Sequence, residues 1–271
     1  MVKKLLKQEF KYYITTVPFI IIMLFGLGVM NWIIQFFESD SWIYNLILSG
    51  TTSMLYLGMI GGAIVSTILI IVRFYKNMFS SEGYLTFTLP VSNAQHILVK
   101  LLAAIAVQSL IMVSVWASVA IVISGNSYRT VIGEALRWII RELLDSLGAF
   151  NMIVYTLEII LIFFALLASS VLSYYACMTV GQMAKKNRIL LAVGCYFGLN
   201  AVTQVLSTVF SIIFLLLSSS GALDAVGRLI LKYPVLSSHA ILVGIALICA
   251  AIAVGWFFLI KWLMTKKLNL E

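Results

Sequence analysis

Charged residues are scarce in this chain: Asp, Glu, Lys and Arg make up 10% of its 271 residues, whereas hydrophobic residues make up 62%. A chain with so little charge cannot keep its apolar surface away from water by folding on itself. The composition therefore excludes an ordinary soluble domain and makes the lipid bilayer the first expected partner.

Residues that carry bond chemistry are also few, with three cysteines and two histidines. Cys177, Cys195 and Cys249 each fall in an apolar run without a CxxC pair, which is typical of buried hydrophobic residues. His96 and His239 lie near the ends of apolar runs, and there is no HExxH motif and no GxSx motif that could partner His239 as a serine protease. We therefore predict no catalytic residue and no metal site, and we disfavour an intramembrane enzyme.

Prolines and phosphate-binding motifs are missing from the places where two transporter classes need them. Pro18, Pro90 and Pro234 lie near or beyond predicted helix ends, so the proline-broken midplane helices of many secondary transporters are absent, although glycine can also unwind a helix. No GxxxxGK[ST] phosphate loop occurs. If ATP drives this protein, another chain must bind it.

Long apolar runs are abundant. Six of them are long enough to cross a hydrocarbon core about 30 Å thick. Because only a helix satisfies its own backbone in lipid, the sequence predicts an all-α polytopic membrane protein with one permease domain over residues 1–271. The expected spans are residues 15–37, 46–72, 97–124, 150–183, 189–218 and 238–264.

The net charge of +8 reflects where the basic residues lie along these spans. With both termini cytoplasmic, only five of the 18 basic residues fall outside: Arg129, Arg137, Arg141, Arg228 and Lys232. This bias follows the positive-inside rule, so the charge indicates orientation and attraction to lipid headgroups and gives no reason to expect nucleic acid. Residues 2–13 place Leu6, Phe10 and Tyr13 at helical spacing among lysines, which predicts a short helix in the cytoplasmic interface.

The longest polar interruption on the basic side runs from Arg73 to Lys100 and reads RFYKNMFSSEGYLTFTLPVSNAQHILVK. Residues 74–79 continue the preceding helix, and Ser92 with Gln95 forms a predicted capping box that starts the next one. Between them, apolar residues such as Tyr84 and Leu85 suit insertion into the groove of a soluble partner. The alternative is an ordinary solvated connection.

Residues 82–92, EGYLTFTLPVS, preceded by RFYKNMF and followed by a lysine inside the next span, resemble the cytoplasmic loop of bacterial ABC-2 type export permeases. The six spans, the basic N-terminal helix and the size resemble that family over the whole chain. The loop is similar to a subgroup in which permease and ATPase are separate polypeptides, including exporters of antimicrobial or phenol-soluble-modulin-like peptides.

This resemblance implies a permease dimer, with a homodimer favoured, in the bacterial cytoplasmic membrane. It implies that each copy docks one cytosolic ABC ATPase subunit, which binds ATP and Mg, and that residues 2–13 form an elbow helix. It also implies a coupling helix made of these residues: Ser80, Ser81, Glu82, Gly83, Tyr84, Leu85, Phe87 and Leu89.

Polar residues inside the spans are the candidates for contact with cargo. Glu158 is the acidic residue well inside a span, and it suits either a cationic cargo or a proton-linked site. The structural alternative is a carboxylate that reaches the interface or bonds a neighbour such as Tyr155. Asn200, Thr203 and Gln204 lie on neighbouring faces of the fifth span, where they either line a polar path or, as we favour, bond to another helix.

Two GxxxG pairs, Gly58 with Gly62 and Gly194 with Gly198, allow close helix approach and suit a subunit interface or packing within the chain equally well. Outside the spans, the residues between Gly125 and Gly148 predict an amphipathic helix parallel to the membrane. The resemblance to ABC-2 type permeases implies an ATP-driven exporter permease for amphipathic, antimicrobial or toxin peptides. The alternative is an ATP-independent secondary transporter or channel.

Overall fold

The computed structural model describes residues 2–37, 39–80, 83, 91–184 and 186–266, and all regular structure in these residues is helical. The elements are α1 (Val2–Tyr13), α2 (Val17–Ile34), the 3-10 turn η1 (Gln35–Phe37), α3 (Trp42–Phe79), α5 (Asn93–Ile123), α6 (Asn126–Gly181), α7 (Arg188–Ser219), α8 (Asp224–Lys232) and α9 (Pro234–Lys266).

Six helices are long enough and apolar enough to cross a membrane, which confirms the prediction of a multi-pass, all-α membrane protein. They are Val17–Phe37, Trp42–Phe79, Asn93–Ile123, Ile132–Gly181, Arg188–Ser219 and Pro234–Thr265. Most helices extend beyond the predicted apolar spans. The 38 residues of α3 measure about 57 Å at 1.5 Å per residue, more than a hydrocarbon core needs, so part of this helix projects beyond it.

Local sequence signals explain where several helices begin. The predicted capping box at α5 is confirmed: the Gln95 amide donates to Ser92 Oγ at 3.4 Å, and the Ser92 amide donates to Gln95 Oε1 at 3.2 Å. Pro18 lies in the first turn of α2, where a missing amide donor costs least. α3 continues to Phe79, as the polar extension of the second span predicts.

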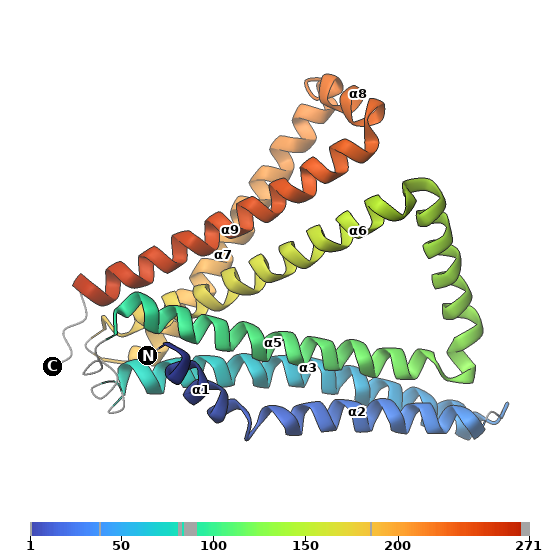
Figure 1. The fold of residues 1–271 in the computed structure, drawn as a ribbon, viewed down its shortest axis with the longest axis horizontal. Coiled ribbons are helices and arrows are strands. Elements are labelled where there is room, and N and C mark those ends of the chain that lie inside the picture. The colour runs from blue at the N-terminus through green and yellow to red at the C-terminus, as the bar shows by residue number, and fades with distance from the viewer. Residues whose placement is uncertain (1, 38, 81–82, 84–90, 185, 267–271) are drawn as a thin grey trace. The chain divides into compact units, whose positions relative to one another are not determined.

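The chain divides into two compact units, of which the first comprises Met1–Asn77 and Pro90–Gly148. Here α2, α3 and α5 run side by side, and α1 lies across one end of the bundle (Figure 1). Gly28 allows α2 to approach α5 closely, since a Cβ at this position would lie 3.2 Å from the Ser118 carbonyl oxygen. The absence of a side chain at Gly28 therefore sets the spacing of these two helices.

A buried polar network ties α2 to both neighbours near its C-terminal end. Asn31 Nδ2 donates to Thr51 Oγ1 at 3.2 Å and to Thr52 Oγ1 at 2.8 Å in α3. Gln35 Nε2 donates to Asn31 Oδ1 at 3.0 Å and to the Val122 carbonyl oxygen of α5 at 3.1 Å. Because hydrocarbon offers no hydrogen-bond partners, these bonds hold the three helices in register.

The second unit comprises Met78–Leu89 and Ala149–Glu271. It holds the later part of α6 together with α7, α8 and α9. α6 bends at Gly148, whose φ of 76° favours glycine, and the helix predicted between Gly125 and Gly148 forms its first part. α6 and α7 approach at Gly181 and Ala192, and the Tyr174 and Tyr196 rings are in contact at a tilt of 50°, with centroids 5.4 Å apart.

Candidate functional site

Only two residues of the predicted coupling segment are within the described part of the chain. The residues Ser81, Glu82, Tyr84, Leu85, Phe87 and Leu89 lie outside it. Ser80 follows α3 directly, and the buried Gly83 donates its amide to the Ser80 carbonyl oxygen at 2.8 Å. A Cβ at Gly83 would lie 2.8 Å from the Met78 carbonyl oxygen, so the backbone turns tightly where α3 ends.

The helices on either side of this segment, α3 and α5, are joined by one carboxylate from α1. Glu9 accepts hydrogen bonds from Arg73 Nε at 2.9 Å, from Asn77 Nδ2 at 2.7 Å and from Lys100 Nζ at 2.7 Å. All four residues, which we name the Glu9 clamp, are at most 9% exposed. The clamp therefore fixes α1 to the last turns of α3 and to the second turn of α5.

Charge explains why the carboxylate at the centre of the clamp stays ionised. Burial raises the pKa of Glu9, but Lys100 and Arg73 together lower it by more, so the net pKa lies below the ordinary value of 4.5. Burial and the adjacent Glu9 raise the pKa of the Tyr13 phenol, which stays protonated. The Arg73 guanidinium also lies 4.4 Å from the centre of the Tyr12 ring, a cation–π contact.

Glu9 was not among the predicted functional residues, although the sequence carries a signal for it. The predicted helix over residues 2–13 is present with its lysines exposed, and the structure shows that Tyr13 is buried. Glu9 precedes Tyr13 by four residues and follows Leu6 by three, so it shares the apolar face of α1. A lone acid on that face, in a helix otherwise charged only by lysines, indicates a buried partner of opposite charge.

The residues predicted to contact cargo do not form one site in the described part of the chain. Glu158, in α6, lies with both carboxylate oxygens near His239 Nδ1 of α9, at 2.9 and 3.0 Å. Its partner is thus His239 and not the suggested neighbour Tyr155, whose hydroxyl bonds Ser238 instead. In the sequence, His239 is recognisable only as a residue near a membrane boundary.

A depth comparison of the two spans would have found this pair. Glu158 lies ten residues after Gly148, and His239 lies five residues after the start of α9 at Pro234. Both residues therefore lie in the early turns of their helical segments. In the predicted six-span topology, these two segments cross the membrane in the same direction. An ionisable residue in a span usually has a polar partner at its own depth.

We predicted that the polar residues of α7 bond to another helix, but Asn200 and Thr203 make their side-chain hydrogen bonds within α7. Asn200 Nδ2 donates to the Tyr196 carbonyl oxygen at 2.8 Å, and Thr203 Oγ1 donates to the Asn200 carbonyl oxygen at 2.9 Å. Both side chains and that of Gln204 are exposed. They remain candidates for a polar face of α7 that meets lipid, cargo or another chain.

The two glycine pairs have different surroundings. A Cβ at Gly58 would lie 2.8 Å from Leu27 Cδ1, and a Cβ at Gly62 would lie 3.2 Å from Ile20 Cγ2, so this pair packs within the chain against α2. Nothing lies within 4 Å of a Cβ at the second pair, Gly194 and Gly198. Only the second pair is therefore open to another chain.

Replacing Gly58 and Gly62 together with alanine is expected to destabilise the chain by about 1 kcal/mol, because the added methyl groups press on α2. The double variant of Gly194 and Gly198 to alanine is the matched control, and its unfolding temperature should equal or exceed that of the wild type, because alanine favours the helix and meets no neighbour there. Thermal unfolding of both variants in the same detergent measures the difference. Equal losses in the two variants would contradict the assignment of the first pair to packing within the chain.

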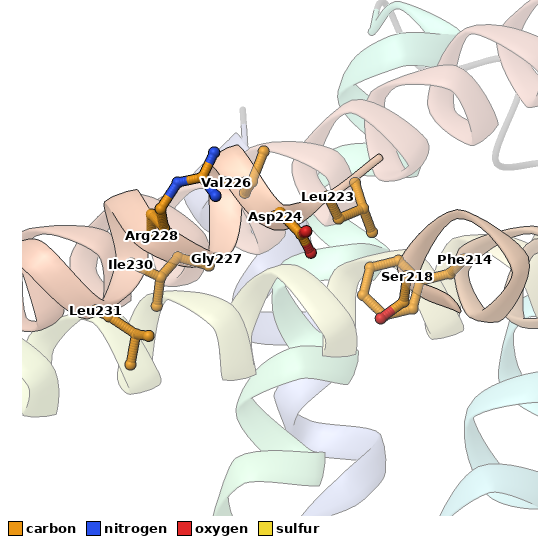
Figure 2. Close-up of a pocket in the computed structure, with 9 residues that line it drawn as sticks. All are labelled: Phe214, Ser218, Leu223, Asp224, Val226, Gly227, Arg228, Ile230 and Leu231. Carbon is orange, nitrogen blue, oxygen red and sulfur yellow. The ribbon is translucent and has the colours of Figure 1, made fainter. Parts of the chain in front are cut away.

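A hollow of about 490 Å³ lies between the end of α7 and the amphipathic helix α8 (Figure 2). Its walls are mainly apolar, with Asp224 and Arg228 as the charged members. It is lined by Phe214, Ser218, Leu223, Asp224, Val226, Gly227, Arg228, Ile230 and Leu231. Apolar walls beside an acid and a base suit contact with amphiphilic molecules, such as the lipids that surround a membrane helix.

Among the described residues, no three His, Cys, Asp or Glu side chains come together in a way that could hold a metal ion. A scan against protein-family models and searches of curated proteins and solved structures found no significant match to this chain. The resemblance to ABC-2 type permeases therefore rests on the sequence motif and the topology.

Proposed function

We propose that this chain is the membrane permease subunit of an ATP-driven ABC exporter, present in two copies and powered by a separate cytosolic ATPase subunit. The observation that supports this proposal best is the Glu9 clamp. It links the helices before and after the segment at residues 80–89 to each other and to α1. A segment whose two flanking helices are joined in this way can pass movement to both at once.

The mechanism follows from that linkage. ATP draws the two ATPase subunits together and pulls on the segment at residues 80–89 of each permease. Because Glu9 contacts Arg73 of α3 and Lys100 of α5, these helix ends move as one body with α1. The permease performs no bond chemistry and converts this movement into opening and closing of a path for cargo.

The proposed cargo is an amphipathic peptide of the antimicrobial or toxin type. Exposed apolar side chains cover most of α7, and the polar residues Asn200, Thr203 and Gln204 interrupt them. A helix that presents both apolar and polar side chains suits a molecule that is itself partly apolar and partly polar. In this proposal the protein works in the bacterial cytoplasmic membrane with both termini in the cytosol, as the basic residues indicate.

The second candidate function is an ATP-independent secondary transporter or channel. The pair formed by Glu158 and His239 favours it, because ionisable groups within spans often bind protons or ions in such proteins. This candidate predicts uptake or efflux by the purified chain in proteoliposomes without ATP or a partner subunit.

Purification of the tagged chain from its native host in mild detergent tests the first candidate. Mass spectrometry is expected to find an ATPase with a Walker phosphate loop in the purified complex. The double variant Tyr84→Asp with Leu85→Asp should release at least nine-tenths of it, whereas Lys186→Asp, an exposed change in another basic connection, should retain it. Recovery of the chain without any ATPase in several mild detergents would overturn the exporter proposal.

A further inference from the structure

The strongest unassigned group of ionisable side chains joins α6 to α9. Both oxygens of the Glu158 carboxylate lie within 3.0 Å of His239 Nδ1, and the two side chains are only 12% and 18% exposed. Both residues belong to helices apolar enough to cross a membrane. A charged side chain in such a position is costly unless its partner compensates it.

Two further contacts, both made by Tyr155, hold the same two helices together. Tyr155 lies one helical turn before Glu158 in α6. The Tyr155 ring stacks on the His239 imidazole, with centroids 4.1 Å apart and an angle of 17° between the planes. The Tyr155 hydroxyl and the Ser238 hydroxyl also share a hydrogen bond. Two consecutive residues of α9 thus contact two residues of α6 that are one helical turn apart, which fixes the orientation of the imidazole ring.

The charge around this group comes from few sources. On α8, which packs on α9, the charged side chains are Asp224, Arg228 and Lys232, and Lys232 Nζ lies 5.2 Å from the centre of the Tyr233 ring. The stretch of α7 from Asn200 to Ser219 carries no charged residue. Glu158 is therefore the anionic group in direct contact with His239, and the protonation of the imidazole decides whether that contact is an ion pair.

We propose that Glu158 and His239 form a proton-binding latch between α6 and α9. When His239 binds a proton, its imidazolium and the Glu158 carboxylate form an ion pair that holds the two helices together. When the proton leaves, a carboxylate faces a neutral imidazole and the attachment weakens. Imidazole is the side chain that proteins most often use as a proton switch, so we expect a lower pH to close the latch.

The physiological meaning of the latch rests on the orientation in the proposed function. In that orientation, the beginnings of the later part of α6 and of α9 lie at the outer surface, where cargo would leave. Acid outside the cell would then hold this end closed and slow export. The latch itself is a property of the chain alone and is tested without the ATPase.

Distances between spin labels on the two helices test the latch in the full chain. The native cysteines are replaced with alanine, and labels are attached at Ile153 of α6 and Ile241 of α9, which are 61% and 52% exposed. Pulsed electron paramagnetic resonance is recorded in nanodiscs from pH 8 to pH 5.5. We expect a longer-distance population at pH 8 that falls at least threefold by pH 5.5.

Two variants and one control make the result specific. Glu158→Gln and His239→Gln should each abolish the pH dependence, and the second variant covers the case in which the first does not fold. Glu134→Gln, an exposed acid in the first part of α6, should keep the wild-type response. A wild-type distribution that does not change with pH, or a response that persists in both glutamine variants, would overturn the latch. Neither result depends on whether an ATPase copurifies.

Discussion

Replacing Glu9 with alanine is expected to lower the free energy of unfolding by about 3–5 kcal/mol, the usual cost of removing one partner from a buried ion pair. The change removes the carboxylate that Arg73, Asn77 and Lys100 all contact. These groups are at most 9% exposed, so water cannot easily replace the lost bonds. The same change should detach α1 from α3 and α5 and, in the proposed exporter, reduce ATP-driven transport more than it reduces ATP hydrolysis.

Thermal unfolding with a thiol-reactive dye measures the loss of stability once the half-buried Cys195 and Cys249 are replaced with alanine, because the buried Cys177 then becomes accessible only when the chain unfolds. Glu9→Gln is the informative second variant, since it keeps an oxygen acceptor for Asn77 and removes only the charge. The control variant Lys7→Ala changes an exposed residue of the same helix, so its unfolding temperature should equal that of the wild type. An unfolding temperature of Glu9→Ala equal to that of Lys7→Ala would refute the clamp.

The pH dependence of the stability difference between the wild type and Glu9→Gln follows from the lowered pKa of Glu9. A carboxyl whose folded pKa lies below its unfolded pKa stabilises the fold fully above the unfolded value, and this contribution is lost as the pH falls through the folded value. The gap between wild type and Glu9→Gln should therefore stay constant between about pH 5 and 8 and shrink only in stronger acid. This behaviour separates the clamp from the latch, which changes within that range.

Replacing Gly181 with alanine is expected to destabilise the second unit by about 1–3 kcal/mol. A Cβ at this position would lie 2.6 Å from the Ala192 Cβ and 2.7 Å from the Arg188 carbonyl oxygen. Because one of these atoms belongs to the backbone, α7 must move away from α6 to accept the methyl group. The change should also disturb the nearby contact between the Tyr174 and Tyr196 rings.

The matched control for this prediction is Gly194→Ala, in the helix that Gly181 contacts. Nothing lies within 4 Å of a Cβ there, so the change should leave stability unchanged or raise it by up to about 1 kcal/mol through better helix propensity. The two variants are compared by unfolding in one detergent at one protein concentration. A loss of the same size at both positions would mean that Gly181 does not set the spacing of α6 and α7.

Several features of the fold were predictable because they depend on neighbouring residues. The six membrane helices follow from apolar length, the start of α5 follows from Ser92 and Gln95, and the N-terminal helix follows from spacing among the lysines. The coupling segment, its ATPase partner and the cargo remain predictions, since most of that segment lies outside the described residues. The structure adds the clamp, which indicates how such a segment would act on α3 and α5.

The polar partners were not predictable in the same way. Glu9 contacts residues 64, 68 and 91 positions away, and Glu158 contacts a histidine 81 positions away. A periodic pattern shows which face of a helix a residue occupies, but it does not show which other helix lies against that face. Likewise, two GxxxG pairs look alike in sequence, yet only Gly58 and Gly62 face a neighbour within the chain.

The sequence alone therefore determined that this protein lies in a lipid bilayer, that it is all-helical and how many helices are long and apolar enough to span the membrane. The physical reason is that a bilayer requires each span to satisfy its own backbone over a fixed length, which is a local condition. Only the tertiary structure decided which ionisable groups meet, because burial of a charge depends on where distant helices bring an opposite charge. Glu9 and the pair of Glu158 with His239 are the ionisable groups whose partners only the tertiary structure shows.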